Sequence, residues 1–505
     1  MESPFNSVIR PRPTQLLPQL LIISFLITLT WPCIEAAAAT QELLKGFEAT
    51  PNPSVSSFQS LLEDSSGKFS FGLLRVNSTE LALAVLHVPS NEPLWLANPK
   101  TLARWSDRTR VFFNGSLVIS DPRSRVFWST GSTQGDKLVL LNNSNLQILG
   151  NSNNDPTVLW QSFDFPTNTL VETQNFTSTM SLISSNGLYS MRLGRDFIGL
   201  YAKFDSDSDQ MYWKHKALQA KAPVIDGNGP VHIRVEPDGW LGMYQNGTTP
   251  VDVESFNSFQ RPLDGLLIVR LEPDGNLKAY YWAGSSWVVD YQAIRETCEL
   301  PNPCGPYGLC TSGSGCSCLD NNTDFSSSGH CAGSGSLFSN DLCTDPNARK
   351  EVKVLRKQGV EVPFKELMSY ETMSSLEECE DSCEKNCSCY GAVYNNASGF
   401  CYILDYPIQT LLGVDDDSKV GYFKMRESAK KKKMDAGLGV GIGLLGGAIV
   451  FLIAAIGFGS YKIWRSQRGV NRILEEEAGG VISGPYKDLG SASFRSIEMC
   501  SGSNR

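Results

Sequence analysis

The distribution of cysteine is the feature that most constrains this chain. Twelve of its fourteen cysteines lie between Cys298 and Cys401, and the other two are Cys33 and Cys500. An even number of closely spaced cysteines is typical of a disulfide framework in an oxidising compartment. The sequence therefore predicts a secreted or cell-surface protein whose last extracellular part is stapled. The twelve form two groups of six: Cys298, Cys304, Cys310, Cys316, Cys318 and Cys331, then Cys343, Cys379, Cys383, Cys387, Cys389 and Cys401. Their spacing leaves the pairing open, since six cysteines allow fifteen pairings.

Two apolar segments predict how the chain meets a membrane. Basic residues, an apolar run and small residues favour a signal peptide over 1–38, which would remove Cys33. Residues 436–459 carry no charge and would form a helix about 36 Å long, enough to cross a bilayer of about 30 Å. Positive charges flank both ends of this segment, so the signal peptide decides the orientation. We expect a single-pass, type I plasma-membrane protein with a transmembrane helix at 436–461 and a cytoplasmic tail at 462–505.

The net charge and the glycosylation sequons restrict further what kind of protein this is. The formal net charge is −9, which argues against a nucleic-acid partner. Asn-x-Ser and Asn-x-Thr sequons are spread over the predicted exterior, so we expect a glycosylated surface. The predicted acceptors are Asn77, Asn114, Asn142, Asn175, Asn246, Asn321, Asn386 and Asn396.

The front of the chain has the pattern of short strands. Residues 40–290 show brief alternating stretches broken by Gly, Asn, Asp and Pro, which predicts β-sandwiches, barrels or prisms. One stretch is repeated: Ile233-Arg-Val-Glu-Pro-Asp-Gly-Trp-Leu recurs as Val269-Arg-Leu-Glu-Pro-Asp-Gly-Asn-Leu. Each copy reads as a strand, a turn and a second strand, so each predicts a hairpin. The repeat reflects either common turn chemistry or a β-prism built from hairpins.

Several motifs in this front part resemble a known family. Pro93-Leu-Trp-Leu-Ala-Asn98 and Trp160-Gln-Ser-Phe-Asp-Phe-Pro-Thr-Asn-Thr-Leu170 are similar to segments of bulb-type, mannose-binding lectins. Residues 180–293 resemble the S-locus glycoprotein domain that follows such a lectin domain, here at 39–175. The chain thus looks like the outer part of a plant S-domain (G-type lectin) receptor. The resemblance implies a mostly β, multidomain protein with β-prism repeats.

The lectin family binds mannose through Gln-x-Asp-x-Asn-x-Val-x-Tyr on one strand, where alternation places all five side chains on one face. The two aligned stretches of the front each keep one residue of this motif. The repeat near residue 276 keeps three, and it offers a candidate sugar site or, equally, an ordinary turn with a tyrosine in the core. The candidate carbohydrate-binding residues are Glu272, Asp274, Asn276 and Tyr280.

The stapled part resembles two small modules. Residues 294–331 are similar to an EGF-like module, and 343–426 to a PAN/apple module. Within the latter, Cys379, Cys383 and Cys387 are spaced to share one face of a helix. The cysteine spacing does not favour zinc, and acidic ligands for calcium are missing before Cys298. We therefore expect disulfides and no metal or other cofactor.

The sequence indicates no catalytic chemistry. No nucleophile–histidine motif, metal-binding helix or phosphate loop accompanies the four histidines, and the tail shows no kinase motif. We expect a non-catalytic recognition protein or co-receptor that contacts receptor kinases or other surface proteins, with PAN modules generally serving protein contacts. The alternatives are a mannose-type lectin that binds glycans and a scaffold or decoy for receptor kinases. Gly439, Gly443 and Gly447 share one face of the predicted span, which allows a homodimer, although glycine is common in such spans.

Overall fold

A computed structural model describes residues 41–426 with internal gaps, and residues 447 and 449–465. The gaps are 124, 153–154, 205–208, 218–230, 246, 257–264, 322–323, 327–328, 330, 332–342 and 344–351. Contacts divide the chain into residues 1–426 and 427–505, which are described separately. The predicted signal peptide, residues 1–38, lies outside the described residues.

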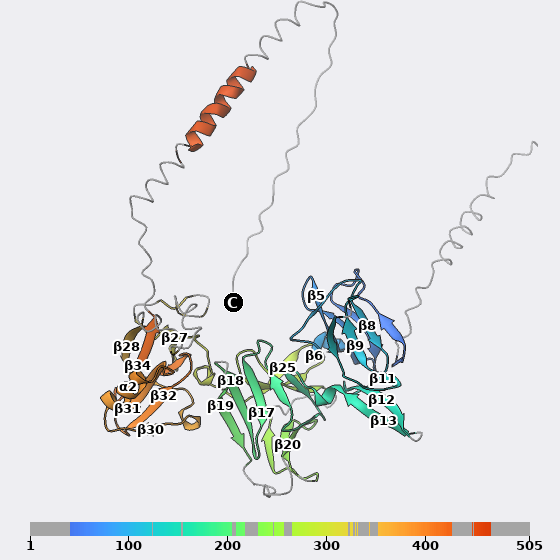
Figure 1. Ribbon diagram of the computed structural model, residues 1–505, viewed down its shortest axis with the longest axis horizontal. Coiled ribbons are helices and arrows are strands. Elements are labelled where there is room, and N and C mark those ends of the chain that lie inside the picture. The colour runs from blue at the N-terminus through green and yellow to red at the C-terminus, as the bar shows by residue number, and fades with distance from the viewer. Residues whose placement is uncertain are drawn as a thin grey trace, which may run out of the picture. The chain divides into compact units, whose positions relative to one another are not determined.

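The front section consists of three antiparallel sheets around one core (Figure 1). The first sheet holds β1 (Glu42–Leu44), β11 (Lys137–Leu140), β12 (Leu146–Ser152) and β13 (Asp155–Gln161). The second holds β10 (Val126–Ser129), β9 (Leu117–Ser120), β8 (Arg110–Phe113) and β2 (Phe47–Ala49). The third holds β3 (Phe58–Glu63), β4 (Phe69–Arg75), β5 (Glu80–His87) and β6 (Glu92–Leu96), with β7 (Ala103–Arg104) beside β5. The prediction of a mostly β fold is confirmed, whereas closure of these sheets into a prism is not seen and stays a prediction.

Aromatic residues of the lectin-like motifs lie together in this core. The indole rings of Trp95, Trp128 and Trp160 approach one another edge to face at 5.8–6.0 Å between centroids. Trp95 Nε1 also donates a hydrogen bond to the carbonyl of Phe165, 2.8 Å away. Large aromatic rings in this arrangement stabilise a core beyond the area they bury. The tryptophan residues of the sequence motifs are therefore structural.

The second section likewise has three sheets around one core, and each of them has four strands. Its sheets are β14 (Thr169–Val171), β23 (Leu267–Leu271), β24 (Leu277–Trp282) and β25 (Trp287–Gln292); β15 (Asn175–Phe176), β20 (His232–Glu236), β21 (Trp240–Tyr244) and β22 (Asp252–Ser255); and β16 (Ser181–Ile183), β17 (Tyr189–Leu193), β18 (Phe197–Lys203) and β19 (Asp209–Lys216). Strand β14 pairs with β23 and β15 pairs with β20, so the strands of this section begin at Thr169. The domain boundary at 175 stays a prediction.

Strand β23 joins the front and second sections. Leu267 and Val269 belong to the core of the second section, whereas Ile268 and the preceding Leu266 belong to the core of the front section. Neighbouring side chains of a strand point to opposite faces, so one strand can serve both cores only if both faces are covered. The two sections are therefore packed together through a strand that is buried on both sides.

The described residues of the stapled section form two sheets and one helix. A mixed sheet runs β27 (Gly315–Cys318), β26 (Gly308–Thr311), β33 (Leu411–Gly413) and β29 (Val360–Glu361). A second sheet runs β28 (Val352–Gln358), β34 (Lys419–Arg426), β31 (Gly391–Asn395), β32 (Phe400–Leu404) and β30 (Glu371–Thr372). Short 3₁₀ turns occur at η1 (Val88–Ser90), η2 (Ser162–Asp164), η3 (Thr297–Glu299) and η6 (Lys365–Leu367).

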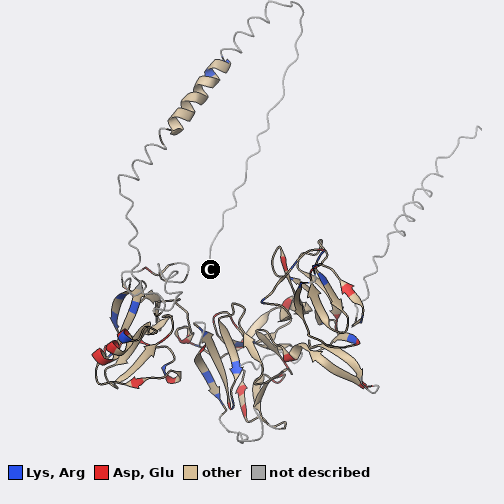
Figure 2. Ribbon diagram, viewed as in Figure 1, with Lys and Arg blue, Asp and Glu red and all other residues tan. Residues whose placement is uncertain are grey.

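Helix α2 (Leu376–Lys385) begins at Ser375, whose side chain accepts a hydrogen bond from the backbone N–H of Glu378. Its exposed face is acidic, as Figure 2 shows. Cys379 and Cys383 are buried on the opposite face, as expected, but the helix ends before Cys387. The prediction that Cys387 shares this face is therefore wrong. The buried Lys424 Nζ donates to the carbonyls of Cys383 and Asn386, at 2.9 and 3.1 Å, and satisfies the helix end there.

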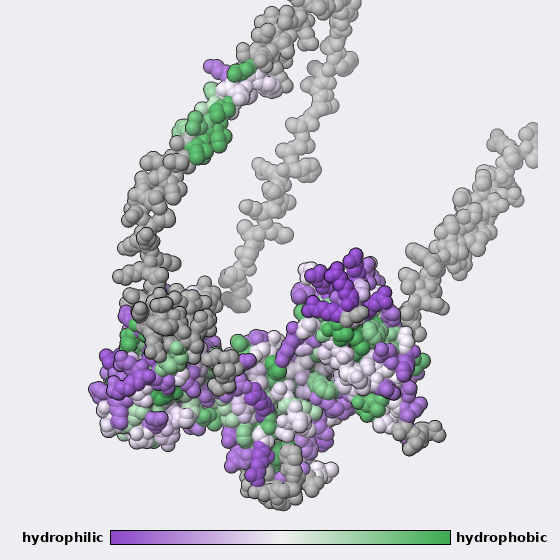
Figure 3. Space-filling model, in the orientation of Figure 1, coloured by the Kyte–Doolittle hydropathy of each residue, from purple (hydrophilic) through white to green (hydrophobic). Residues whose placement is uncertain are grey.

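Residues 449–465 are helical, and Figure 3 shows many apolar side chains along them. Among the described residues, no helix combines the length and apolar character needed to cross a membrane. The predicted span, 436–461, lies partly outside the described residues, and so does most of the predicted tail, 462–505.

Candidate recognition sites

The two copies of the repeat form hairpins with the same internal hydrogen bond. Tyr244 donates its hydroxyl hydrogen to Glu236, and Tyr280 donates to Glu272, each across 2.6 Å. Burial and the neighbouring carboxylate raise the pKa of Tyr244 to about 12, and they raise the pKa of Tyr280 as well. Both tyrosines therefore remain protonated donors at any physiological pH.

The turns of both hairpins depend on glycine. Gly239 and Gly275 have φ angles of 93° and 88°, in the left-handed region that glycine adopts without a steric penalty. The N–H of each donates to the carbonyl of the preceding glutamate, Glu236 or Glu272, at 3.0 Å. The sequence signal Pro-Asp-Gly thus corresponds to two tight, matching turns.

The four candidate sugar ligands form two separate pairs. Tyr280 is bonded to Glu272, and Asp274 accepts the backbone N–H of Asn276 at 2.8 Å. The side chain of Asn276 is only 3% exposed, and it bonds both backbone groups of Ile294, donating at 2.7 Å and accepting at 3.0 Å. An amide used in this way is not free for a sugar hydroxyl. Sugar binding at this hairpin stays a prediction, and the geometry gives Asn276 a structural role.

Seven of the eight predicted glycosylation sites fall on described residues, and all seven asparagines are exposed. Asn246 lies outside the described residues. In three cases the amide oxygen is held by the sequon itself: Asn77 accepts the backbone N–H of Thr79 at 2.9 Å, Asn114 accepts that of Ser116 at 3.2 Å, and Asn386 accepts that of Ser388 at 3.0 Å. Exposure satisfies what an attached glycan requires, and glycosylation stays a prediction.

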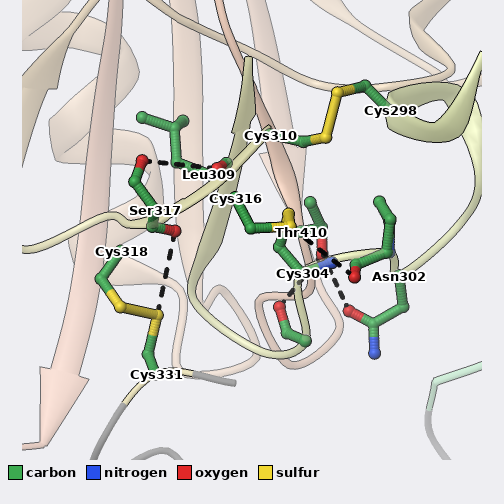
Figure 4. Close-up of a disulfide and its surroundings, with 12 residues drawn as sticks. Cys298, Asn302, Cys304, Leu309, Cys310, Cys316, Ser317, Cys318, Cys331 and Thr410 are labelled. Carbon is green, nitrogen blue, oxygen red and sulfur yellow. Dashed lines mark hydrogen bonds between the residues drawn. A yellow bond between two sulfur atoms is a disulfide. The ribbon is translucent and has the colours of Figure 1, made fainter. Parts of the chain in front are cut away.

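All twelve cysteines of the block are paired, and each group of six pairs within itself. The first group forms Cys298–Cys310, Cys304–Cys316 and Cys318–Cys331 (Figure 4). The second forms Cys343–Cys387, Cys379–Cys401 and Cys383–Cys389. The sulfur atoms of Cys304, Cys310 and Cys316 lie within 4.8 Å of one another, a spacing that thiolate ligands of a metal would show. Because each sulfur is already in a disulfide, this trio offers no thiolate to a metal.

The two stapled modules share one sheet. Strand β26 from the EGF-like region pairs in parallel with β33 from the PAN-like region. Thr410 reinforces the junction, since its hydroxyl accepts the backbone N–H of Cys304 at 2.9 Å and lies 3.1 Å from Asn302 Oδ1 (Figure 4). Tyr307 is buried and donates its hydroxyl hydrogen to the carbonyl of Lys424 at 3.1 Å. The EGF-like and PAN-like modules are therefore joined into one folded unit.

The comparisons with known proteins agree with this architecture. A PAN domain-containing protein of Arabidopsis thaliana is 57% identical over 480 residues, which are 95% of this chain and 96% of that protein. The chain belongs to this PAN domain-containing family. Within it, family models match the D-mannose binding lectin at residues 93–192, the S-locus glycoprotein domain at 245–323 and the PAN domain at 355–424.

More distant relatives of this PAN domain-containing chain are receptor-like kinases. Two G-type lectin S-receptor-like serine/threonine-protein kinases of Arabidopsis thaliana are 28% and 24% identical, over 69% and 77% of the chain. The chain spans only 41% and 47% of their lengths. Among solved structures, a Marasmius oreades lectin is similar over 25% of the chain and 89% of that lectin, at 21% identity and a TM-score of 0.19. So low a score supports no conclusion about fold or ligand.

An aromatic patch on the PAN domain was not anticipated from the sequence. The ring of Tyr370 lies 4.2 Å from that of Phe400 and 5.8 Å from that of Tyr402, and Tyr370 is 50% exposed. Tyr370 precedes β30, the two-residue strand at the edge of the sheet. Phe400 and Tyr402 lie two residues apart on β32, and the pairing of β30 with β32 brings the distant Tyr370 to them. The apolar run Phe400–Leu404 predicts a strand, but it gives no signal for Tyr370.

Proposed function

We propose that this protein is a non-catalytic cell-surface recognition protein or co-receptor that acts through protein contacts of its extracellular part. The family models that match the chain are a lectin, an S-locus domain and a PAN domain, and the more distant relatives are named as receptor-like kinases. A signal peptide at 1–38 and a single span at 436–461 would place residues 39–435 outside the plasma membrane. The domain boundaries expected from the sequence belong to this proposal.

The observation that carries the proposal is the aromatic patch in which the exposed Tyr370 packs on the partly buried Phe400 and the buried Tyr402. Interface cores are enriched in tyrosine and phenylalanine, and a few such residues supply most of the binding free energy. The patch is held rigidly, because the neighbouring Cys401 is bonded to Cys379 of α2. A rigid aromatic surface loses little conformational entropy on binding, which favours a protein partner.

Proximity labelling with the full chain at the plant cell surface tests this proposal. We expect receptor kinases among the labelled proteins, and we expect Tyr370→Ala to reduce their labelling at least about tenfold, since a hot-spot residue contributes 2 kcal/mol or more. The matched control is Phe165→Ala, which removes another exposed aromatic ring, 56% accessible, from the front section. Unchanged labelling of the same proteins by Tyr370→Ala would contradict the assignment of the patch. Capture of a second copy of the chain instead would indicate a homodimer, and no labelled protein at all would refute recognition by protein contact.

A second candidate function is sugar binding, favoured by the match to the D-mannose binding lectin model over residues 93–192. A glycan array probed with the wild type and with Asp274→Ala tests it. Mannose binding that is lost in this variant would support a lectin whose site includes Asp274. Binding that persists would place any sugar site elsewhere.

A further inference from the structure

A cavity of about 360 Å³ lies between the front and second sections. Phe69 and His87 line it from β4 and β5, and Leu266 and Trp282 line it from the ends of the β23–β24 hairpin. Small-ligand sites have volumes of about 300–1,000 Å³, so this cavity has room for a small ligand. Asn142, in the turn between β11 and β12, is also part of its lining.

We propose that an N-linked glycan on Asn142 occupies this cavity, with its first N-acetylglucosamine against Trp282. Asn142 begins the sequon Asn142-Asn143-Ser144, and its side chain is exposed. Within the described residues, the side chain of Asn142 has no hydrogen bond, whereas the amide nitrogen of Asn77 donates to Glu80 at 2.7 Å. The amide nitrogen that would carry the glycan is therefore free and already at the cavity.

The lining suits a neutral sugar. A pyranose ring has an apolar C–H face that packs on aromatic rings, and hydroxyl and acetamide groups that form hydrogen bonds. Trp282 supplies a supported ring, since its centroid lies 5.4 Å from that of Trp287 and 5.5 Å from that of His87. The charged residues of the lining are one cation, Lys68, and one carboxylate, Glu172, so the wall carries no net charge.

His87 also lines the cavity, and its imidazole ring is neutral. Burial, and then the charge of Lys68, lower its pKa to about 4. Its Nδ1 lies 2.8 Å from the Ser90 hydroxyl, which fixes the orientation of the ring. The cavity therefore keeps the same shape and charge over the physiological pH range.

An occupant of this cavity would touch both sections. Phe69 and His87 belong to the front section, while Trp282 belongs to the second. A glycan that contacts both walls would oppose their separation and shield Trp282 from solvent. The glycan is thus assigned a structural role in holding the sections together.

The test uses the full chain purified from plant cells, with two variants that remove the sequon. Asn142→Gln removes the acceptor, and Ser144→Ala removes a buried hydroxyl that has no hydrogen-bond partner among the described residues. Asn396→Gln is the control, because it removes an exposed sequon in the PAN domain, outside the cavity lining. We expect glycopeptide mass spectrometry to find Asn142 occupied. Both sequon variants should lower the melting temperature by about 2–4 °C and increase acrylamide quenching of tryptophan fluorescence, and the control should do neither.

Two results would overturn this assignment. One is an unmodified Asn142, including the case in which free N-acetylglucosamine then raises the melting temperature, since the cavity would bind a soluble sugar instead. The other is an occupied Asn142 whose removal in both variants changes quenching and melting no more than Asn396→Gln does.

Discussion

The two hairpins of the repeat share a sequence but occupy different positions. In both, a tyrosine bonds a glutamate at the same distance, and a glycine with positive φ closes the turn. They differ at the residue after this glycine, which is Trp240 in the first hairpin and Asn276 in the second. Asn276 is buried and bonded to Ile294, whereas Trp240 is partly exposed. The local motif therefore determines the hairpin, and Asn276, which has no counterpart in the first copy, attaches the second hairpin to Ile294.

The arginines of the repeat show the same contrast. Arg234 bonds the glutamate of its own strand, Glu236, at 2.6 Å. Arg270 instead reaches the front section, where it donates to Glu92 at 2.7 Å, and it also donates to Thr169 of β14 in its own sheet at 3.0 Å. The second hairpin is thus the one built into the junction between sections. Its residues are expected to matter more for stability than their counterparts in the first hairpin.

The largest expected effect is that of Asn276→Ala. Removing this amide leaves the backbone N–H and carbonyl of Ile294 buried without partners, and each unpaired group costs about 1–3 kcal/mol. We expect a loss of about 3–4 kcal/mol in the free energy of unfolding, against about 1 kcal/mol for Trp240→Ala. Urea titration of the purified full chain measures both. Equal losses would show that the two turns are equivalent and that Ile294 finds other partners.

The next largest expected effect is a difference in acid sensitivity between the two hairpins, which arises from a histidine in contact with each of them. His87 contacts Trp282 and Trp287 of the second hairpin's sheet, and burial followed by Lys68 lowers its pKa from 6.5 to about 4. The unfolded chain then binds more protons than the folded chain between these values, so stability is full above pH 6.5 and falls as the pH drops towards 4. The loss is at most ~3 kcal/mol.

His232 stacks on Tyr244 of the first hairpin, and burial with Arg234 lowers its pKa too. Because His232 is more exposed, its share of the acid sensitivity should be smaller. Urea titrations of His87→Gln and His232→Gln at pH 7.5 and 4.5 compare the two shares. If His232→Gln removes as much of the pH dependence as His87→Gln, the junction does not account for the acid sensitivity.

Local features of the fold could be predicted from the sequence, because they depend on neighbouring residues. The Pro-Asp-Gly turns, the short strands and the disulfide character of the block all follow from spacing and side-chain chemistry. The end of α2 before Cys387 could not be predicted from the spacing of the cysteines. It depends on Lys424, which lies far along the chain and satisfies the carbonyls at the helix end.

Contacts between sections could not be predicted from the sequence for a related reason. The double burial of β23, the parallel pairing of β26 with β33 and the meeting of Tyr370 with Phe400 each join residues whose separation leaves no periodic signal. The candidate sugar site is the opposite case. Its motif of alternating polar residues was visible, but the pattern does not reveal that Asn276 faces Ile294 and not solvent.

The smallest expected difference concerns the two arginines, and it measures the junction most directly. The side chain of Arg270 is 16% exposed and that of Arg234 is 34% exposed, so the guanidinium of Arg270 is less screened by water. We expect Arg270→Ala to cost about 2 kcal/mol, and Arg234→Ala about 0.5 kcal/mol, in the free energy of unfolding. A double-mutant cycle with Glu92→Gln isolates the pair, and a coupling of about 1 kcal/mol is expected between residues that belong to different sections. The matching cycle of Arg234 with Glu236→Gln should give less, because the guanidinium of Arg234 is more exposed and that pair lies within one strand. A coupling near zero for Arg270 and Glu92 would mean that the packing of β23 alone holds the sections together, and that the repeat differs between its copies only at Asn276.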